Sequence, residues 1–268
     1  MATVQKTATA AENGLPRELA PGIHWLTDCL VMMHQGEPVH SYSSAYLIDG
    51  DGFSLLVDTG HPRDWEEIRR QLDVCHAKGV PPVRYIVPTH SEVPHSANLG
   101  LLLERYPDAV ACGDMRDYHL IWPEHVSRFV EMKAGDRIDL GKTEFVFVPA
   151  VVKDLVTSLW GYATTQRCLF PGDGFAYMHH HHQGECGKVA EECPELPVEE
   201  FTSLFAEHAL YWTKFTDMEH VIAKLDALLD VEFPVDVIAP GHGNPVIDPK
   251  VTFPRFKEGL LLGASITN

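Results

Sequence analysis

The sequence comprises 268 residues, of which 45% are hydrophobic and 22% are charged, a balance typical of a globular domain. Its formal net charge of −17 would repel nucleic acid and anionic membrane surfaces, so we expect neither as a partner. The sequence has no apolar run near the roughly 20 residues that a membrane-spanning helix requires.

Residues 1–21 are polar and lack the apolar core of a secretory signal, so we expect a flexible lead-in before a single domain at 22–268. The six cysteines are scattered and form no CxxC pair, which favours reduced thiols and a cytoplasmic location. Cys186 and Cys193 share an irregular insertion at about 178–197, where a disulfide or a metal site is the alternative to free thiols.

The first half of the chain predicts strands that alternate with helices. The segment from Gly50 to Gly52 is a turn signal between two strand-like segments, which predicts a β-hairpin. The apolar run at 83–90 suits a buried strand, because its polar residues begin only where the strand ends. The predicted strands are 22–32, 43–49, 53–60, 83–90 and 109–113, and the predicted helices are 64–71 and 98–106.

The second half adds two strand pairs, two amphipathic helices and a final strand. Residues 114–130 predict helix and loop, and a short helix is expected near the C-terminus. The predicted strands are 137–140, 143–150, 158–164, 167–173 and 235–243, and the predicted helices are 199–212 and 217–229. Strand pairs interleaved with helices indicate α/β layers with the sheets in the middle.

Four short polar clusters each follow a predicted strand, at the point where that strand ends. Strand ends that face one edge of a sheet can converge, and α/β folds usually build their sites there. Each cluster supplies His, Glu or Asp, the side chains that bind transition metals. The clusters are THSEVPH (89–95), VVKDLV (151–156), FPGDG (170–174) and APGHG (239–243). Together they predict one metal site assembled from all four.

The order of these motifs resembles the metallo-β-lactamase superfamily. LLVDTG (55–60) is followed by His-x-Glu-x-x-His, Gly-Asp-Gly and Pro-Gly-His-Gly, as in that fold. Hydrolases of the superfamily usually carry a His at the second ligand position, whereas Glu92 stands there in this sequence. The diiron domain of flavodiiron proteins also has a Glu at that position, so the sequence most resembles that domain. The resemblance implies an α/β fold, an αββα sandwich of two mixed β-sheets flanked by helices.

The same resemblance implies a two-metal centre with a shared carboxylate. His90 and Glu92 would bind the first metal, and His95 and His242 would bind the second. Asp173 would bridge the two ions. We expect iron, with two ions per chain or alternatively one, and zinc or manganese as the alternative metals.

Two positions depart from the family pattern. The family places a further His ligand of the first metal where this sequence has Asp154. A carboxylate can also ligate, and it makes the site harder, which favours iron or manganese over zinc. The family also has an Asp directly before the last His of its first motif, but Pro94 stands there and cannot ligate. The second site would therefore be weak, more open to water or substrate, or empty.

Other residues near the motifs have expected roles. Asp58 is expected to hold the first motif loop by hydrogen bonding. Tyr177 follows Asp173 closely and is a candidate catalytic residue together with Asp173 and Glu92. The run His179–His182 predicts an exposed loop with incidental metal affinity, because four consecutive histidines cannot all face one ion.

A carboxylate-rich iron site can bind and reduce O2, because Fe(II) donates electrons and the carboxylates tolerate the change of oxidation state. We therefore expect a non-haem iron or diiron oxidoreductase that binds or activates O2 and acts on a small molecule. A metal-dependent hydrolase that activates water on its metal is the first alternative. A non-catalytic sensor of O2 or metal is the second.

The source of electrons has to be found outside the motifs described so far. The sequence shows no glycine-rich phosphate-binding loop of the kind that a flavin-binding segment would use. We therefore expect an external electron donor, or a substrate that supplies the electrons itself. The resemblance also implies a homodimer.

Overall fold

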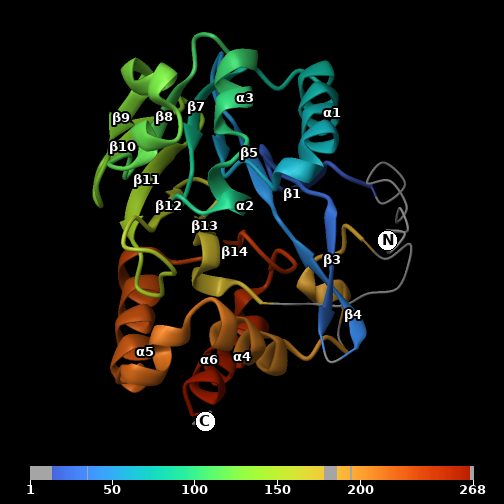
Figure 1. Cartoon of the computed structure of the whole chain (residues 1–268), viewed down its shortest axis with the longest axis vertical. Helices are drawn as coiled ribbons and strands as arrows, with labels where there is room; N and C mark the ends of the chain where they lie inside the picture. The colour runs from blue at the N-terminus through green and yellow to red at the C-terminus, as the bar shows by residue number, and fades with distance from the viewer. Residues whose placement is uncertain (1–13, 35, 178–185, 194, 266–268) are drawn as a thin grey trace.

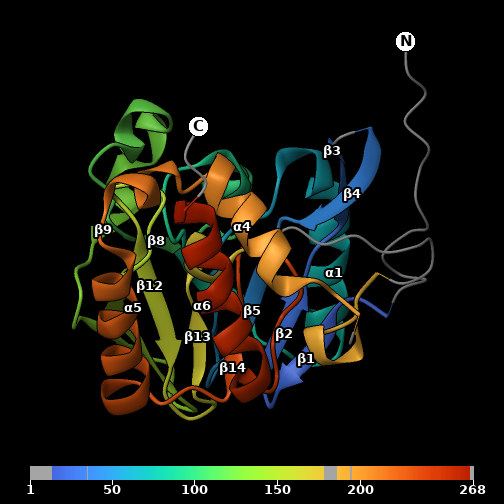
Figure 2. The ribbon, with the colours of Figure 1, turned by 90° about the horizontal axis from the view of Figure 1, so that it is seen from below.

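Two β-sheets lie face to face between two layers of helices, as Figures 1 and 2 show. The computed structural model describes residues 14–34, 36–177, 186–193 and 195–265. Helices α1 to α3 cover one side of the pair of sheets, and helices α4 to α6 cover the other. The αββα sandwich predicted from the sequence is therefore confirmed.

The first sheet has seven strands in the order β1-β2-β5-β6-β7-β8-β9. Strands β1, β2, β5 and β6 pair antiparallel, and strands β6 to β9 pair parallel. The strands are β1 (Arg17–Ala20), β2 (Ile23–Leu26), β5 (Ala45–Asp49), β6 (Ser54–Val57), β7 (Val83–Val87), β8 (Val110–Gly113) and β9 (Phe129–Glu131). In the parallel half, the carboxyl ends of the strands meet at one edge of the sheet.

The second sheet has five strands in the order β10-β11-β12-β13-β14. Neighbouring strands pair antiparallel except β13 and β14, which are parallel. The strands are β10 (Arg137–Asp139), β11 (Glu144–Pro149), β12 (Leu159–Ala163), β13 (Cys168–Phe170) and β14 (Val237–Ile238). A separate hairpin consists of β3 (Cys29–His34) and β4 (Glu37–Tyr42).

The α-helices flank the pair of sheets, and α4 packs mainly against α6. Their bounds are α1 (Trp65–Ala77), α2 (Val93–Ser96), α3 (Leu99–Arg105), α4 (Val198–His208), α5 (Met218–Ala227) and α6 (Pro249–Ser265). Across the described part of the chain, none of them combines the length and the apolar character needed to cross a membrane. Five of the six cysteines are buried, and Cys193 is partly buried.

Three apolar layers hold the sandwich together. Tyr46 of β5 and Phe147 of β11 belong to the layer between the two sheets. Their neighbours Leu47 and Val146 belong to the outer layers beneath the helices. Because successive side chains of a strand point to opposite faces, each strand contributes to two layers at once. Both sheets are therefore buried on both faces, and only their edges are free to carry a site.

The predicted strand at 22–32 is wrong in its length, because the structure divides it into β2 and β3. The side-chain amide of Gln71 accepts a hydrogen bond from the Thr27 N–H at 3.0 Å and donates one to the Thr27 carbonyl at 2.8 Å. These bonds replace the strand pairing at Thr27, and the chain then leaves the main sheet to form the β3–β4 hairpin.

Several element bounds also differ from the prediction. The strand β1 lies inside the expected lead-in 1–21, and it pairs with β2. Strands β4 and β9 were not predicted, and β9 has only three residues, too few for a pattern of alternation. The final strand covers two residues of the predicted 235–243, whereas the C-terminal helix α6 has 17 residues.

Replacing Gly161 by Ala should destabilise the fold. A Cβ atom at this position of β12 would overlap the ring of Phe145 on β11. We expect Gly161→Ala to lower the free energy of unfolding by about 1–3 kcal/mol, measured by chemical denaturation. The loss should shrink when the same change is made in a Phe145→Leu background. An equal loss in both backgrounds would contradict the packing explanation.

Candidate metal centre

The four motifs converge at the carboxyl ends of strands from both sheets. His90 follows β7, and Glu92 and His95 lie at the start of α2. Asp173 lies in a 3₁₀ turn directly after β13, and His242 lies in the loop after β14. Asp154 joins them from the loop between β11 and β12. The convergence expected from the sequence is therefore present in the fold.

Backbone hydrogen bonds tie these loops to one another. The Leu159 N–H donates to the Thr89 carbonyl at 2.8 Å, which joins β12 of one sheet to the motif loop of the other. The Gly241 N–H donates to the Gly172 carbonyl at 2.8 Å, and the Ser44 N–H donates to the Gly241 carbonyl at 2.9 Å. The loops that carry the ligands are thus fixed by main-chain contacts before any side chain is considered.

Two glycines allow the loops to approach so closely. A Cβ atom at Gly241 would overlap the imidazole of His95. Gly172 has a φ of +53°, and a Cβ atom there would lie 2.6 Å from the hydroxyl of Thr89. Only glycine avoids both the strain and the overlap. The first glycine of each motif, Gly172 and Gly241, is therefore required where its loop approaches Thr89 and His95.

Three carboxylates surround one imidazole nitrogen at nearly equal distances. The Nε2 atom of His90 lies 3.8 Å from Glu92 Oε2, 3.9 Å from Asp154 Oδ2 and 3.8 Å from Asp173 Oδ2. Metal bonds to nitrogen and oxygen are about 2.0–2.2 Å long, so two ligands of one ion lie about 3–4 Å apart. Each carboxylate thus lies at a distance from His90 that two ligands of one cation can have. One ligand atom each from His90, Glu92, His95 and Asp173 also lies within 4.8 Å of the others.

A second set of atoms gathers around the other oxygen of Asp173. His95 Nε2 lies 3.1 Å from Asp173 Oδ1, and His242 Nε2 lies 3.6 Å from the same oxygen. The Oδ2 atom of this carboxylate faces His90, as described above. Asp173 therefore presents one oxygen to each of two ligand sets, the arrangement of a carboxylate that bridges two ions.

Hydrogen bonds on the far side of two imidazoles leave their Nε2 atoms free. His95 Nδ1 lies 2.8 Å from Asp58 Oδ2, and Asp58 Oδ1 accepts bonds from the N–H and hydroxyl of Thr89. His242 Nδ1 lies 2.5 Å from the carbonyl oxygen of Tyr42. When Nδ1 donates to an oxygen, the lone pair is left on Nε2, which is the usual preparation of a histidine ligand.

Several buried polar atoms of the cluster lack a hydrogen bond. Within the described ranges, His90 Nε2, His95 Nε2 and Asp173 Oδ1 have no hydrogen-bond partner. Burying a polar group without a partner costs free energy, so such atoms usually have a ligand or an ion to satisfy them. All three atoms point to the positions that the distances assign to cations. The donor set of imidazoles and carboxylates therefore fits one or two transition-metal ions.

The electrostatics of the cluster also call for positive charge. Burial opposes charge on His95, but the carboxylates of Asp58 and Asp173 outweigh it and raise the pKa of His95 well above its usual range. Burial likewise opposes charge on Asp173, yet His95 and His242 hold its pKa well below the usual value. Burial and repulsion from Asp173 and Glu92 raise the pKa of Asp154 to about 6. These carboxylates repel one another unless cations lie among them.

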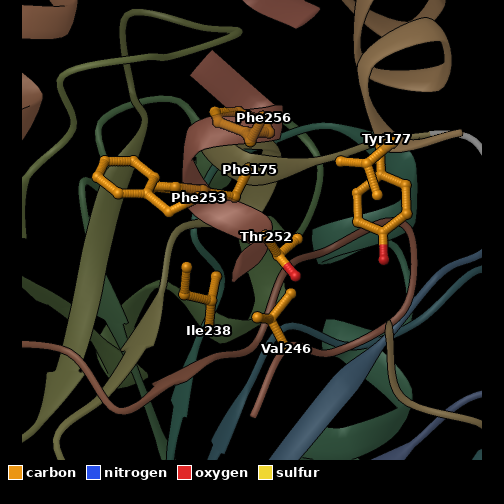
Figure 3. Close-up of a pocket in the computed structure, with 8 residues that line it drawn as sticks. Phe175, Tyr177, Ile238, Val246, Thr252, Phe253 and Phe256 are labelled. Carbon is orange, nitrogen blue, oxygen red and sulfur yellow. The ribbon is translucent and has the colours of Figure 1, made fainter. Parts of the chain in front are cut away.

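Tyr177 does not face the ligand cluster. Figure 3 shows it in the wall of a small cavity of about 10 Å³ between β14 and α6, lined largely by aromatic and aliphatic side chains. Its hydroxyl donates to the Asn244 carbonyl at 3.0 Å and accepts from the Asn244 N–H at 3.1 Å. Its ring packs closely against Gly243. We therefore interpret Tyr177 as a positioning residue for the His242 loop rather than as a catalytic residue.

The remaining sequence candidates fall in different places. Pro94 occupies the first turn of α2, where a proline sacrifices no helical hydrogen bond. Its side chain offers no ligand, as expected. The run His179–His182 lies outside the described residues, so its predicted exposure stays a prediction.

Two ligand side chains of the first set are more exposed to solvent than those of the second set. The second set was expected to be the more open one, but the side chains of His95 and His242 are only 1% and 9% exposed. In the first set, Glu92 is 48% exposed and Asp154 is 13% exposed. Pro94 leaves the second set short of a ligand, but the side chains of His95 and His242 stay shielded from solvent.

The expected role of Asp58 in holding the motif loop is confirmed by its bonds to Thr89 and His95. Sequence reasoning missed two other groups that orient the ligands. The Tyr42 carbonyl belongs to a strand that was not predicted, and a backbone oxygen leaves no signal in the sequence. Thr89 stood in the quoted motif directly before His90, but its bonds to Asp58 cross 31 positions of the chain and become visible only in the fold.

A buried histidine–carboxylate cluster at the strand ends of an αββα sandwich defines the class: a metal-binding protein of this fold. The sequence profile of the Metallo-beta-lactamase superfamily matches residues 39–242, more than half of the chain. The chain therefore belongs to the metallo-β-lactamase superfamily.

Within this superfamily, the chain is similar to characterised oxidoreductases. The coenzyme F420H2 oxidase of Methanothermobacter marburgensis is 25% identical over 247 residues, which cover 87% of this chain and 58% of that protein. The anaerobic nitric oxide reductase flavorubredoxin of Vibrio vulnificus is 28% identical over 207 residues, which cover 76% of this chain and 40% of that protein. This chain thus spans only part of the relatives it matches.

The structural comparison agrees with the sequence relatives. The flavodiiron protein of Giardia intestinalis matches with a TM-score of 0.75 and 18% identity, covering 92% of this chain and 59% of that one. At this identity, the likeness establishes a shared fold. The resemblance to flavodiiron proteins expected from the motifs is therefore confirmed.

Removing the carboxylate behind His95 should weaken metal binding without removing a ligand. Because Asp58 holds His95 by its Nδ1 atom, Asp58→Ala should lower the affinity for Fe(II) about 10- to 100-fold. Anaerobic Fe(II) titration measures this, with the exposed residue Asp230, changed to Ala, as the charge-matched control. Unaltered affinity in Asp58→Ala would show that this hydrogen bond does not prepare the ligand.

Proposed function

We propose that the protein is a non-haem diiron oxidoreductase that binds and activates O2, with NO as a related substrate. The observation that carries this proposal is the position of Asp173, whose two oxygens face two separate sets of ligand atoms. A shared carboxylate is what a centre of two cooperating ions requires. The relatives named for F420H2 oxidation and nitric oxide reduction support redox chemistry at such a centre.

The two ligand sets differ in character. His90, Glu92 and Asp154 would hold the first ion, with one nitrogen and two carboxylates besides the shared Asp173. His95 and His242 would hold the second, as the residues with bare Nε2 atoms beside Asp173 Oδ1. Oxygen-rich ligands favour iron or manganese over zinc. We therefore propose iron for the first site, and the same metal for the second on the strength of the family resemblance.

Iron bound here would supply the electrons that reduce O2, because it changes readily between its ferrous and ferric states. The protein's own contribution is to hold the ligand side chains in position and to shield most of them from solvent. Asp58 and the Tyr42 carbonyl fix two imidazoles, and the loops are joined by main-chain bonds. Glu92 is the ligand that solvent reaches, so small molecules would enter on its side.

The proposal includes an external supply of electrons. We infer a separate electron donor or a substrate that supplies the electrons itself, because iron that has reduced O2 must be reduced again before the next turnover. We keep the cytoplasm as the proposed location, because the six cysteines are scattered in the sequence and form no CxxC pair. A homodimer remains part of the proposal on the strength of the family resemblance alone.

Metal-dependent hydrolysis is the second candidate, because membership of the superfamily does not by itself fix the chemistry. Metal identity and O2 consumption separate the two. Protein purified without added metal should contain iron, and the anaerobically reduced protein should develop a visible absorption band on exposure to O2. An oxygen electrode should record uptake when a reductant is supplied. Zinc as the tightly held metal, with no O2 uptake by the iron-loaded protein, would favour the hydrolase.

The bridging role of Asp173 predicts unequal losses of metal. Asp173→Ala removes an oxygen from both ligand sets, so elemental analysis should find both ions lost. His95→Ala removes one nitrogen from the second set and should leave about one iron per chain, bound by His90, Glu92 and Asp154. The exposed control Asp230→Ala should retain the wild-type content. If Asp173→Ala kept its full iron content, the shared-carboxylate arrangement would be wrong.

A further inference from the structure

A surface cavity of about 490 Å³ lies beside the proposed first metal site. The loop between β11 and β12 forms one wall, and residues of the segments around Trp212 and α5 form the other. This volume lies within the range of about 300–1,000 Å³ in which proteins bind small organic molecules. The cavity is therefore large enough for a ligand many times larger than O2.

The cavity reaches the metal centre through Asp154. This residue lines the cavity, and its Oδ2 atom lies 3.9 Å from His90 Nε2. Its side chain is only 13% exposed, so it separates the cavity from the ligand cluster rather than projecting into solvent. A molecule bound in the cavity would thus lie against a residue of the first ligand set.

Most of the cavity wall is apolar. Val151, Leu155, Val156 and Val221 contribute aliphatic side chains, and Val156 is 79% exposed. The indole N–H of Trp212 donates to the Lys153 carbonyl at 2.7 Å, so its one polar group is already used. The wall therefore offers hydrocarbon and an aromatic ring, and covering it would remove apolar surface from water.

Two lysines give the cavity a positive rim. Lys153 and Lys224 line it, and neither forms an ion pair with any residue that the structure describes. The chain has 38 acidic residues and 21 basic ones, so cations without a carboxylate partner are in the minority. Lys153 does not pair with its neighbour Asp154, whose oxygen faces His90 instead. The stems of both lysines can extend the apolar wall while their amines bind an anion.

We propose that this cavity binds a small amphipathic organic anion, a carboxylate with a hydrocarbon body, as the organic substrate of the centre. The role of the anion as a substrate rests on the proposed diiron function, whereas its binding to the cavity does not. Because Asp154 would repel a second carboxylate, the anionic group belongs at Lys153 and Lys224. The hydrocarbon end then points towards Asp154 and the ligand cluster.

Three probes that share one hydrocarbon chain test this assignment by isothermal titration calorimetry. They are octanoate, the neutral 1-octanol and the cationic octylammonium, added to the iron-loaded protein in 0.15 M salt. Octanoate should bind at least about tenfold more tightly than octylammonium, with 1-octanol between them. Equal binding of the anion and the cation, or no binding of octanoate, would overturn the proposal.

The variants locate the site. The double change Lys153→Gln and Lys224→Gln should weaken octanoate about tenfold and change 1-octanol less than twofold. Val156→Ser should weaken all three probes together. Lys133→Gln removes a positive charge from an exposed position outside the cavity and should leave octanoate binding unchanged. A loss in Lys133→Gln as large as in Lys153→Gln would show that bulk charge, and not the cavity, attracts the anion.

The metal content of the same preparations separates the two proposals. Octanoate that binds as expected to protein with no retained iron would leave the cavity assigned and would overturn the diiron function. Protein that holds two irons and takes up O2, but shows no preference for octanoate, would support the diiron function and overturn the proposed anion site.

Discussion

The structure depends on a concentration of negative charge that cannot stay buried alone. Asp173 and Asp154 lie around His90 with Glu92 beside them, and Asp58 lies behind His95. Bringing ionised carboxylates this close inside a protein is unfavourable unless cations or protons compensate them. The pKa of His95 reflects the same negative charge, because Asp58 and Asp173 raise it well above the usual range although burial opposes this. Two divalent ions would neutralise the four carboxylates and also satisfy the bare Nε2 atoms.

Residues around the cluster fix the ligand side chains by hydrogen bonds on the side away from the proposed ions. Each of the two imidazoles beside Asp173 Oδ1 is fixed through Nδ1, one by a carboxylate and one by a main-chain carbonyl. Tyr177 and the glycines around His242 fix the last loop from the opposite side. The ligands therefore do not have to reorganise when an ion arrives, and less binding free energy is spent on ordering them.

The sequence predicted the layers and the ligand cluster for the same physical reason. Strand ends in a layered α/β fold are obliged to meet at an edge, so the polar residues directly after β7, β13 and β14 had few other places to lie. What it could not predict was contact between distant backbone and side chain. The Gln71 amide that divides the first predicted strand, and the Tyr42 carbonyl behind His242, have no local pattern. Closeness to Asp173 in sequence also does not give the direction of the Tyr177 ring, which packs against Gly243 while its hydroxyl bonds to Asn244.

The two departures from the family motif have different structural consequences. Pro94 leaves the second set with His95, His242 and the shared Asp173, yet these side chains stay almost fully buried. An open coordination position there would be reached only by a very small molecule. Asp154 belongs to the first set, and it also lines the cavity with its apolar wall and unpaired lysines. Access therefore differs between the two sets. The side chains of His95 and His242 are almost fully buried, whereas Glu92 is half exposed and Asp154 borders the cavity in which we propose that an organic anion binds.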